Sequence, residues 1–262
     1  MKVTYEDHMG TDLSVVNAAK VSFGKRSEWE NSPTEFRPDP HNPKLAKQDQ
    51  SLIAFLARGC TSGDWENIKQ SLCDLDGTYD WECENMEEIL NHIRKMPSHW
   101  SPFAHTAVML HLKMPIFVAR QIMSQTKDID FTEMDFEGEP EFYVPDVWRK
   151  KADNVKQGSS DEAVYLDLHE FEKEGYYYTY CDVLLGEYER LLGAGVAPEQ
   201  ARMVLPQSMY TEVIATGNLW AWANLYIQRS DSHAQKETQD LAKQIGEIIQ
   251  PLYPASWSCL VA

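Results

Sequence analysis

Apolar and polar residues follow two distinct periods along this chain, and each period predicts one type of element. From residue 106 to residue 114 they alternate one by one, which is typical of a strand with one buried face. Pro115 is then expected to open a helix over residues 116–123, because proline fits the first helical turn. Residues 45–58 place leucine and isoleucine on one helical face, and Gly59 is expected to end that helix.

The N-terminal residues and residues 161–195 predict further strands and helices. The N-terminal residues predict a strand, a Gly-Thr-Asp turn and a short helix that ends near Lys20 and is capped by Asp12 or Ser14. Residues 161–195 have a helical period, so we expect an amphipathic helix that stops at Gly193.

The remaining segments complete one domain. A further helix is expected from Pro198, and residues 218–253 predict two helical stretches joined around the sequence SDSH. The polar, proline-bearing residues 24–43 are interpreted as a surface loop. Residues 60–98 are acidic and are interpreted as an elaboration on the domain. Without internal repeats or a linker, residues 1–262 are expected to form a single domain.

Composition narrows the classes of protein and partner. The 262 residues are 43% hydrophobic and 11% aromatic, which is enough to bury a sizeable core. Against 24 Lys and Arg stand 41 Asp and Glu, and the formal net charge of −17 disfavours nucleic acid as a partner. A phosphate ligand must therefore find a local basic pocket.

Cysteine and histidine usage predicts no metal site and no disulfide framework. The five cysteines form no CxxC or Cys/His ligand pattern, and an odd number suits a reducing cytoplasm better than a secreted framework. His105, His111 and His233 lack the carboxylate company of a metal site. No apolar run approaches a membrane span or a signal peptide, so a soluble, unprocessed, cytoplasmic protein is expected.

Several motifs occur in a fixed order from one end of the chain to the other: HMGTDLSVVNAAKVSFGKRSEW, HWSPFAH, PIFVARQ, FYVPDVWR, ARMVLPQSMYTE and DSHAQKE. In this order they resemble the flavin-dependent thymidylate synthases, also called thymidylate synthase complementing proteins. The resemblance covers most of the chain apart from residues 60–98. It implies an α+β fold with a central, mostly antiparallel sheet surrounded by helices, and a homotetramer whose sites draw on several subunits.

The same resemblance implies a reaction. Members of this family methylate C5 of dUMP with methylenetetrahydrofolate as carbon donor, while FAD carries hydride from NADPH, and they need no cysteine nucleophile. Such chemistry requires cations for the nucleotide phosphate and donors that polarise the pyrimidine carbonyls. The expected small-molecule partner is a pyrimidine deoxynucleotide.

Four residues match the substrate contacts of the family. By resemblance, Arg202 of ARMVLP contacts the phosphate, and Arg229 of IQRSDSH points at the pyrimidine carbonyl edge, where it is the catalytic candidate. Guanidinium suits both tasks because it is always charged and presents a planar fork of donors. Gln121 of VARQ is expected beside the nucleotide, and Glu133 of FTEMD stands for the glutamate of the family signature.

Five residues match the flavin contacts. The resemblance places His99 and Ser101 of HWSPFAH, together with Asn218, Trp220 and Asn224, against FAD. Amide and hydroxyl groups hydrogen-bond flavin edges without demanding a charge. Asn218 also suits the N-cap of the helix that follows it, a role compatible with cofactor contact.

The chain departs from the family at its basic signature, written roughly RHRxxSxNExSxRY, with Lys-His variants in phage-like members. Here the basic triplet falls on the uncharged sequence SQT of residues 124–126, and Trp220 occupies a position that is usually arginine. Asp128 and Asp130 add negative charge nearby. Each lost cation removes a few kcal/mol of charge-assisted bonding to a phosphate.

Three alternatives follow from this departure. The first is an active synthase with substitute contacts, such as Lys127 or Arg149, and with Trp220 and Trp222 stacking on a ring. The second is a hydroxymethylase acting on dUMP or dCMP, in which the acidic residues face an exocyclic amine. The third is a non-catalytic protein of the same fold that has lost FAD binding.

Overall fold

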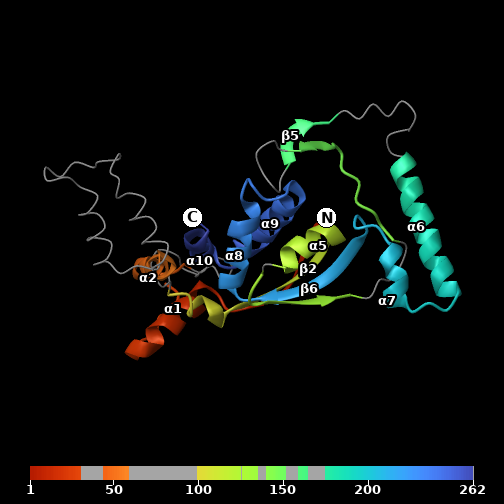
Figure 1. Ribbon diagram of the computed structural model, residues 1–262. Coiled ribbons are helices and arrows are strands. Elements are labelled where there is room, and N and C mark those ends of the chain that lie inside the picture. Colours follow the sequence, from red (N-terminus) through yellow and green to blue (C-terminus); the bar gives the residue numbers. More distant parts are fainter. Residues whose placement is uncertain are drawn as a thin grey trace, which may run out of the picture. The chain divides into compact units, whose positions relative to one another are not determined.

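A computed structural model describes residues 1–30, 44–58, 99–124, 126–134, 140–151, 159–164 and 175–261. The expected segment 60–98 lies outside these residues, as does most of the expected loop 24–43. The helices and strands, labelled in Figure 1, are β1 (Lys2–Met9), α1 (Asp12–Lys20), η1 (Val21–Phe23), α2 (Lys47–Arg58), η2 (Phe103–His105), β2 (Ala107–Pro115), α5 (Ile116–Met123), β3 (Ile129–Glu133), β4 (Arg149–Lys151), β5 (Ser159–Ala163), α6 (Gly175–Gly193), α7 (Pro198–Ala201), η3 (Arg202–Val204), β6 (Tyr210–Gly217), α8 (Leu219–Ser230), α9 (Lys236–Ile249) and α10 (Pro254–Leu260).

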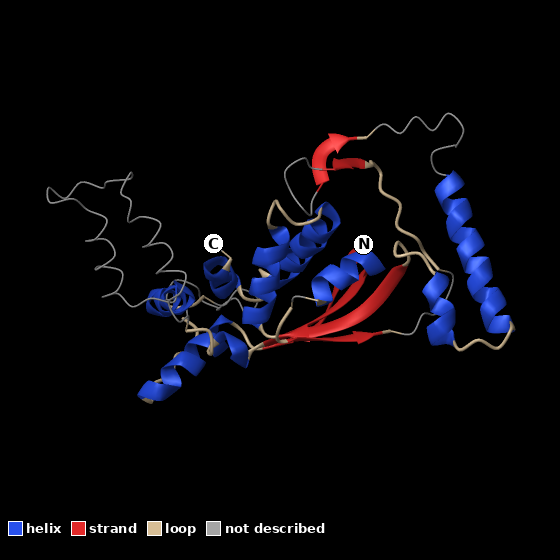
Figure 2. Ribbon diagram, viewed as in Figure 1, coloured by secondary structure: helices blue, strands red, loops and turns tan. Residues whose placement is uncertain are grey.

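A four-stranded antiparallel sheet with strand order β1-β2-β6-β3 is the largest sheet among the described residues. Figure 2 shows its strands in red, together with the separate β4–β5 pair. Along β2, Val108, Leu110 and Leu112 are fully buried while Met109 is 37% exposed, as the one-by-one alternation predicts. The α+β class with an antiparallel sheet is therefore confirmed.

Strand β6 was not predicted, although its sequence YTEVIATG carries the signal. Val213 and Ala215 are fully buried and alternate with half-buried neighbours along the strand. Its apolar positions are few and small, so the period is weaker than in β2. Pairing with β2 on one side and β3 on the other decides its conformation.

The contacts divide the described chain into two compact units, each built from three stretches of sequence. Unit 1 contains Met1–Glu6, Met109–Thr216 and Leu225–Gly246, and unit 2 contains Asp7–Val108, Gly217–Asn224 and Glu247–Ala262. The boundaries fall within β1, β2, β6, α8 and α9.

In unit 1, α5 and α9 carry apolar faces into the core. Val118 and Ile122 of α5 and Leu241 and Ile245 of α9 are fully buried. The helix predicted over 161–195 is wrong at its start, because residues 159–163 form β5. This strand pairs antiparallel with β4, whose Arg149 lies opposite Ala163, and that long-range pairing overrides the helical period.

In unit 2, α1, α2 and α10 pack against one another. Thr11, and not Asp12, is the N-cap of α1, and the Ser14 hydroxyl accepts a hydrogen bond from the Thr11 backbone N–H at 3.1 Å. The buried carboxylate of Asp12 instead accepts bonds from the backbone N–H groups of Ala255 and Ser256 at 2.8 and 2.9 Å. Asp12 thus caps the first turn of α10.

The predicted ends of several helices are confirmed. Helix α2 ends at Arg58, α6 ends at Gly193, and α8 and α9 are separated by residues 231–235. The helix expected from Pro198 is only one turn of α-helix and continues as the 3-10 turn η3. Within the described residues, no helix is both long and apolar enough to cross a membrane.

Candidate functional site

A hydrogen-bonded junction between α5 and α8 lies at the centre of the candidate site in unit 1. The Arg229 guanidinium in the last turn of α8 donates a hydrogen bond from Nη2 to the backbone oxygen of Gln121 at 2.7 Å. Burial lowers the pKa of Arg229 below its ordinary value. One donor of the guanidinium is used in this bond, which leaves further N–H groups that can bind a carbonyl edge.

The side chain of Gln121 forms hydrogen bonds with two residues, one in the first turn of α9 and one just before that helix. Thr238 donates its hydroxyl to the Gln121 side-chain oxygen at 3.0 Å, and the Gln121 amide nitrogen donates to the side-chain oxygen of Gln235. Gln121 was predicted to lie beside the nucleotide. In this structure both ends of its amide bind protein atoms, so the amide also orders the junction around Arg229.

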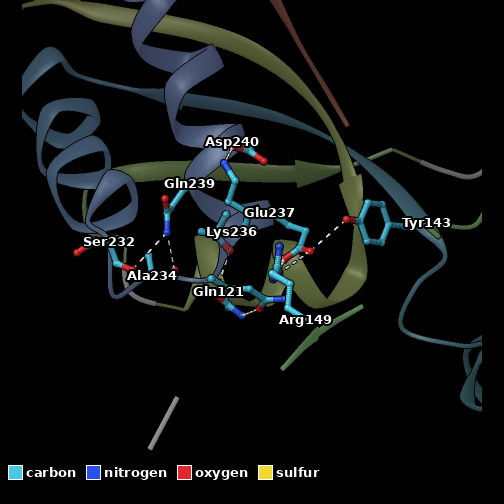
Figure 3. A network of polar contacts seen from close by, with 11 residues as sticks. Gln121, Tyr143, Arg149, Ser232, Ala234, Lys236, Glu237, Gln239 and Asp240 are labelled. Atoms are coloured by element: carbon cyan, nitrogen blue, oxygen red, sulfur yellow. Dashed lines mark hydrogen bonds and ion pairs between the residues drawn. The ribbon is translucent and has the colours of Figure 1, made fainter. Parts of the chain in front are cut away.

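An ion pair beside this junction was not predicted from the sequence. Arg149 of β4 donates from Nη2 to both carboxylate oxygens of Glu237 on α9, at 2.7 and 2.6 Å, and the Tyr143 hydroxyl donates to Glu237 Oε1 at 3.1 Å (Figure 3). The Glu237 side chain is 6% exposed and that of Arg149 is 20% exposed. Arg149 was predicted as a substitute cation for the lost signature, but Glu237 already compensates its charge.

The pKa values follow from this arrangement. Burial alone raises the pKa of Glu237, but the hydrogen bonds and charge of Arg149 outweigh burial and hold the pKa below its ordinary value. Burial, followed by the negative charge of Glu237, raises the pKa of Tyr143 well above its ordinary value. The carboxylate is therefore ionised and the phenol protonated at neutral pH.

A pocket with a volume of about 380 Å³ lies against this ion pair in unit 1. Its walls come from the start of α5, the strap of residues 143–149, the turn of residues 206–208, residue 237 in the first turn of α9 and residue 235 just before that helix. Backbone bonds hold two walls together: Phe117 N–H donates to Gln207 at 3.1 Å, and Tyr143 N–H donates to Ser208 at 2.8 Å.

Arg202 and Glu133, the other two predicted substrate contacts, are exposed. Arg202 begins η3 and Glu133 ends β3. Neither forms a hydrogen bond or ion pair with Gln121 or Arg229 in the part of the chain that the structure describes. The structure thus brings together two of the four predicted substrate residues. Lys127, the other substitute cation, is exposed just before β3.

Unit 2 holds the five predicted flavin contacts, on the HWSPFAH turn and around the start of α8. The ring of His99 stacks on Phe55 with centroids 5.4 Å apart, and Trp220 stacks on Phe103 at 6.4 Å. Asn218 accepts the Ala221 backbone N–H at 2.9 Å, so the predicted N-cap is confirmed. Ser101 is exposed and Asn224 is half-buried on α8.

A buried threonine that was not predicted ties these two segments together within unit 2. The Thr106 hydroxyl donates to the Phe103 backbone oxygen at 2.7 Å and accepts the Leu219 backbone N–H at 3.1 Å. Trp222, predicted to stack on a ligand ring, is fully buried and donates its indole N–H to the Val108 oxygen at 3.1 Å. That prediction is wrong, because the ring packs inside the protein.

The flavin candidates suit a ring better than a charged group. The capping bond uses the side-chain oxygen of Asn218, so its amide N–H groups remain as donors. Trp220 and His99 present flat aromatic surfaces. None of the five carries the permanent positive charge that a diphosphate attracts. These residues therefore fit the isoalloxazine part of a flavin and leave its diphosphate to other groups.

Comparison with known proteins finds relatives that match nearly the whole chain. The sequence profile described as "Thymidylate synthase complementing protein" matches residues 44–255. The flavin-dependent thymidylate synthase of Kosmotoga olearia is 34% identical over 261 residues, covering 97% of this chain and 86% of that protein. The corresponding enzyme of a Thermus thermophilus strain is 29% identical over 258 residues, covering 96% and 72%.

A solved structure supports the fold. The crystal structure of the UMP/dUMP methylase PolB from Streptomyces cacaoi, bound with 5-Br dUMP, superposes with a TM-score of 0.63 at 24% identity, covering 98% of this chain and 93% of that one. The profile, the relatives and the shared fold agree across nearly the whole chain. The chain therefore belongs to the thymidylate synthase complementing protein family, the family of the flavin-dependent thymidylate synthases.

Proposed function

We propose that this protein is a flavin-dependent enzyme that transfers a one-carbon unit from methylenetetrahydrofolate to C5 of a pyrimidine deoxynucleotide, converting dUMP to dTMP. In this proposal it works as a cytoplasmic homotetramer. The observation that carries the proposal is the Arg229–Gln121 junction, which holds a partly buried guanidinium with donors to spare. Family membership supports the reaction class.

The roles of the residues follow from their chemistry. Arg229 donates hydrogen bonds to a pyrimidine carbonyl, which withdraws electron density from the ring and stabilises the charge that develops as C5 attacks the one-carbon unit. The Gln235 and Thr238 contacts to Gln121 keep this guanidinium in place. Arg202, which is exposed, binds the nucleotide phosphate by a charge-assisted contact.

The cofactor is held by unit 2. His99, Ser101, Asn218, Trp220 and Asn224 would bind the flavin ring through stacking and uncharged hydrogen bonds. A bound FAD would supply the redox chemistry, which is transfer of hydride equivalents from NADPH to the transferred carbon. Because none of these five residues is a permanent cation, we expect FAD to bind weakly.

A second candidate is the same transfer with another base or another fate of the carbon. Asp130 and Glu133 are exposed on β3, and the preceding Asp128 has a left-handed backbone with φ of 63°. A carboxylate accepts hydrogen bonds from an exocyclic amine, which cytosine has and uracil lacks. This favours testing dCMP beside dUMP, and hydroxymethylation beside methylation.

Nucleotide binding tests the proposal without requiring turnover. We expect dUMP or dCMP to raise the melting temperature, since a ligand that binds the native state stabilises it. Replacing Arg202 with Ala should weaken both nucleotides alike, by about 2 kcal/mol, because a phosphate contact does not distinguish the bases. Replacing Arg229 with Ala should change the ranking of dUMP against dCMP. Arg190→Ala, on the exposed surface of α6, is the matched control for loss of a charge.

The outcomes separate the alternatives. Equal losses of dUMP and dCMP in the Arg229 variant would contradict its role at the base. If no pyrimidine nucleotide stabilises the parent protein, the non-catalytic alternative is favoured. A product assay with methylenetetrahydrofolate, NADPH and FAD then distinguishes a methylated from a hydroxymethylated base.

A further inference from the structure

The Arg149–Glu237 pair has no part in the roles assigned above, although it lies next to a residue that binds Gln121. Glu237 and Thr238 are neighbours in the first turn of α9. Glu237 binds the strap of residues 143–149 through Arg149, as Figure 3 shows. Thr238 donates its hydroxyl to the side-chain oxygen of Gln121 on α5 at 3.0 Å. The first turn of α9 is therefore held between the strap and α5.

The start of a helix depends strongly on such side-chain contacts. The backbone N–H groups of the first turn have no partner within the helix, so the helical hydrogen bonds fix this turn less firmly than the turns that follow. Thr238 is fully buried and the Glu237 side chain is 6% exposed, so little water can take the place of either contact. A shift of Glu237 therefore moves Thr238 with it.

The strap is a firm support because it is bonded at both of its ends. At one end the Tyr143 backbone N–H donates to the Ser208 oxygen at 2.8 Å. At the other end Arg149 lies opposite Ala163 in the β4–β5 pair. Without Arg149, the carboxylate of Glu237 would be a buried charge that lacks its main partner, and such a charge moves towards water or another donor.

The same turn of α9 reaches Arg229 through one further residue. Thr238 and Gln235 bind the two ends of the Gln121 amide. The Arg229 guanidinium donates from Nη2 to the backbone oxygen of Gln121 at 2.7 Å. The direction of the guanidinium thus depends on the place of Gln121, which depends in turn on the first turn of α9. A small displacement of a hydrogen-bonding group is enough to change how a ligand is bound.

We propose that Arg149 and Glu237 are positioning residues for Arg229. Their ion pair fixes the first turn of α9 against the strap, and so sets the direction of the Arg229 guanidinium and the preference for one pyrimidine base over another. This inference rests on the proposed function, in which Arg229 meets the carbonyl edge of the base. A guanidinium only donates hydrogen bonds, so a well-placed Arg229 favours uracil, which has a carbonyl where cytosine has an amine. Loss of the pair should therefore weaken dUMP more than dCMP.

Calorimetric titration of the full-length protein with dUMP and with dCMP measures this preference as a ratio of dissociation constants. Arg149→Met should shift the ratio towards dCMP by about threefold to fivefold, the scale of one neutral hydrogen bond. Thr238→Val leaves the ion pair intact and removes the hydroxyl that binds Gln121, so it should shift the ratio in the same direction. The affinity for 2-deoxyribose 5-phosphate, which lacks a base, should be unchanged in both variants.

A conservative variant and a matched control separate positioning from stability. Both bonds to Glu237 come from the single nitrogen Nη2, so the ammonium of lysine can replace them, and Arg149→Lys should restore most of the parent ratio. Lys20 of unit 2 is the matched control, because its side chain is 25% exposed and pairs with that of Asp49, which is 4% exposed. Lys20→Met should lower the stability in a similar way and leave the ratio unchanged.

A double variant tests whether the pair acts through Arg229. Arg149→Met should shift the ratio in the parent protein but not in the Arg229→Ala protein, because no guanidinium is then left to position. A shift of equal size in both proteins would overturn the inference. A ratio that shifts as much in Lys20→Met as in Arg149→Met would overturn it as well, since the effect would then follow from stability alone.

The inference and the proposed function fail in different ways. If Arg229→Ala changes the ratio while Arg149→Met and Thr238→Val do not, the inference is refuted and the proposed function stands. If neither nucleotide binds, or if Arg229→Ala leaves the ratio unchanged, the proposed role of Arg229 is refuted and the inferred preference with it. Should Arg149→Met not fold, Thr238→Val decides the same question.

Discussion

Replacing Arg149 with Met tests how strongly the buried ion pair of unit 1 holds the strap of residues 143–149 to α9. Methionine keeps the length of the side chain and removes its charge and both short bonds to Glu237. Removing one partner of a fully buried pair typically costs about 3 to 5 kcal/mol. Here Arg149 is 20% exposed and Glu237 keeps its bond from Tyr143, so we expect a loss of about 2 to 3 kcal/mol.

The pH dependence of this loss has a definite sign. Arg149 holds the pKa of Glu237 below its ordinary value near 4.5, so the pair contributes stability above that pH, and the contribution is lost as the pH falls through the lowered value. In the Met variant Glu237 has lost that stabilisation of its charged form. Burial then raises the pKa of Glu237 in the variant, so the difference between parent and variant should be largest at pH 7 and should shrink as the pH falls through that raised value.

Urea unfolding at pH 7 and at several values down to pH 4 measures both quantities. The control is Lys150→Met on the same strand, because Lys150 and its partner Glu162 are 52% and 71% exposed and such surface pairs contribute little. Glu237→Gln should cost less than Arg149→Met, since Arg149 can turn towards water. A loss in the Arg149 variant no larger than in the Lys150 variant, or one that does not change with pH, would refute the reasoning.

Three further predictions concern unit 2, the flavin and the assembly. Thr106→Val should lower the free energy of unfolding by about 1 to 3 kcal/mol, because the buried Leu219 N–H and Phe103 oxygen lose their shared partner. Thr106→Ser keeps the hydroxyl and should retain most of the stability. Urea titration of both variants measures the two free energies of unfolding. Added FAD should bind weakly with a shift in its visible spectrum, and riboflavin should bind within a few-fold of it; strong preference for FAD would reveal a diphosphate site that these residues do not explain. Light scattering should report a tetramer at micromolar concentration, and a stable monomer would contradict a site shared between subunits.

Local sequence was enough for elements whose pattern is strong. Strand β2 and helix α5 were predicted together because Pro115 separates a period of two from a helical period, and both signals are local. Strand β6 was missed, and the start of the helix predicted over 161–195 was wrong. Both segments are strands because of partners far away in the sequence, and local periodicity does not identify those partners.

Some residues of the candidate site could be predicted from the sequence, and others depend on the fold. The motif positions identified Gln121, Arg229 and Asn218, and the structure places the first two in direct contact and makes the third an N-cap. Trp222 was assigned to a ligand on residue type alone. Its burial and its bond to Val108 became visible only when β2 and α8 were packed together.

By itself the sequence determined the family, the acidic balance and the loss of the basic signature, because motif order and charge are properties of the chain. Only the tertiary structure shows which cations already have an acidic partner that compensates their charge. Arg149 was a substitute cation in the sequence, but Glu237, 88 positions away, binds it through both oxygens. A cation attracts a ligand strongly only when no closer anion compensates its charge. Folding sets the distance between the cation and that anion.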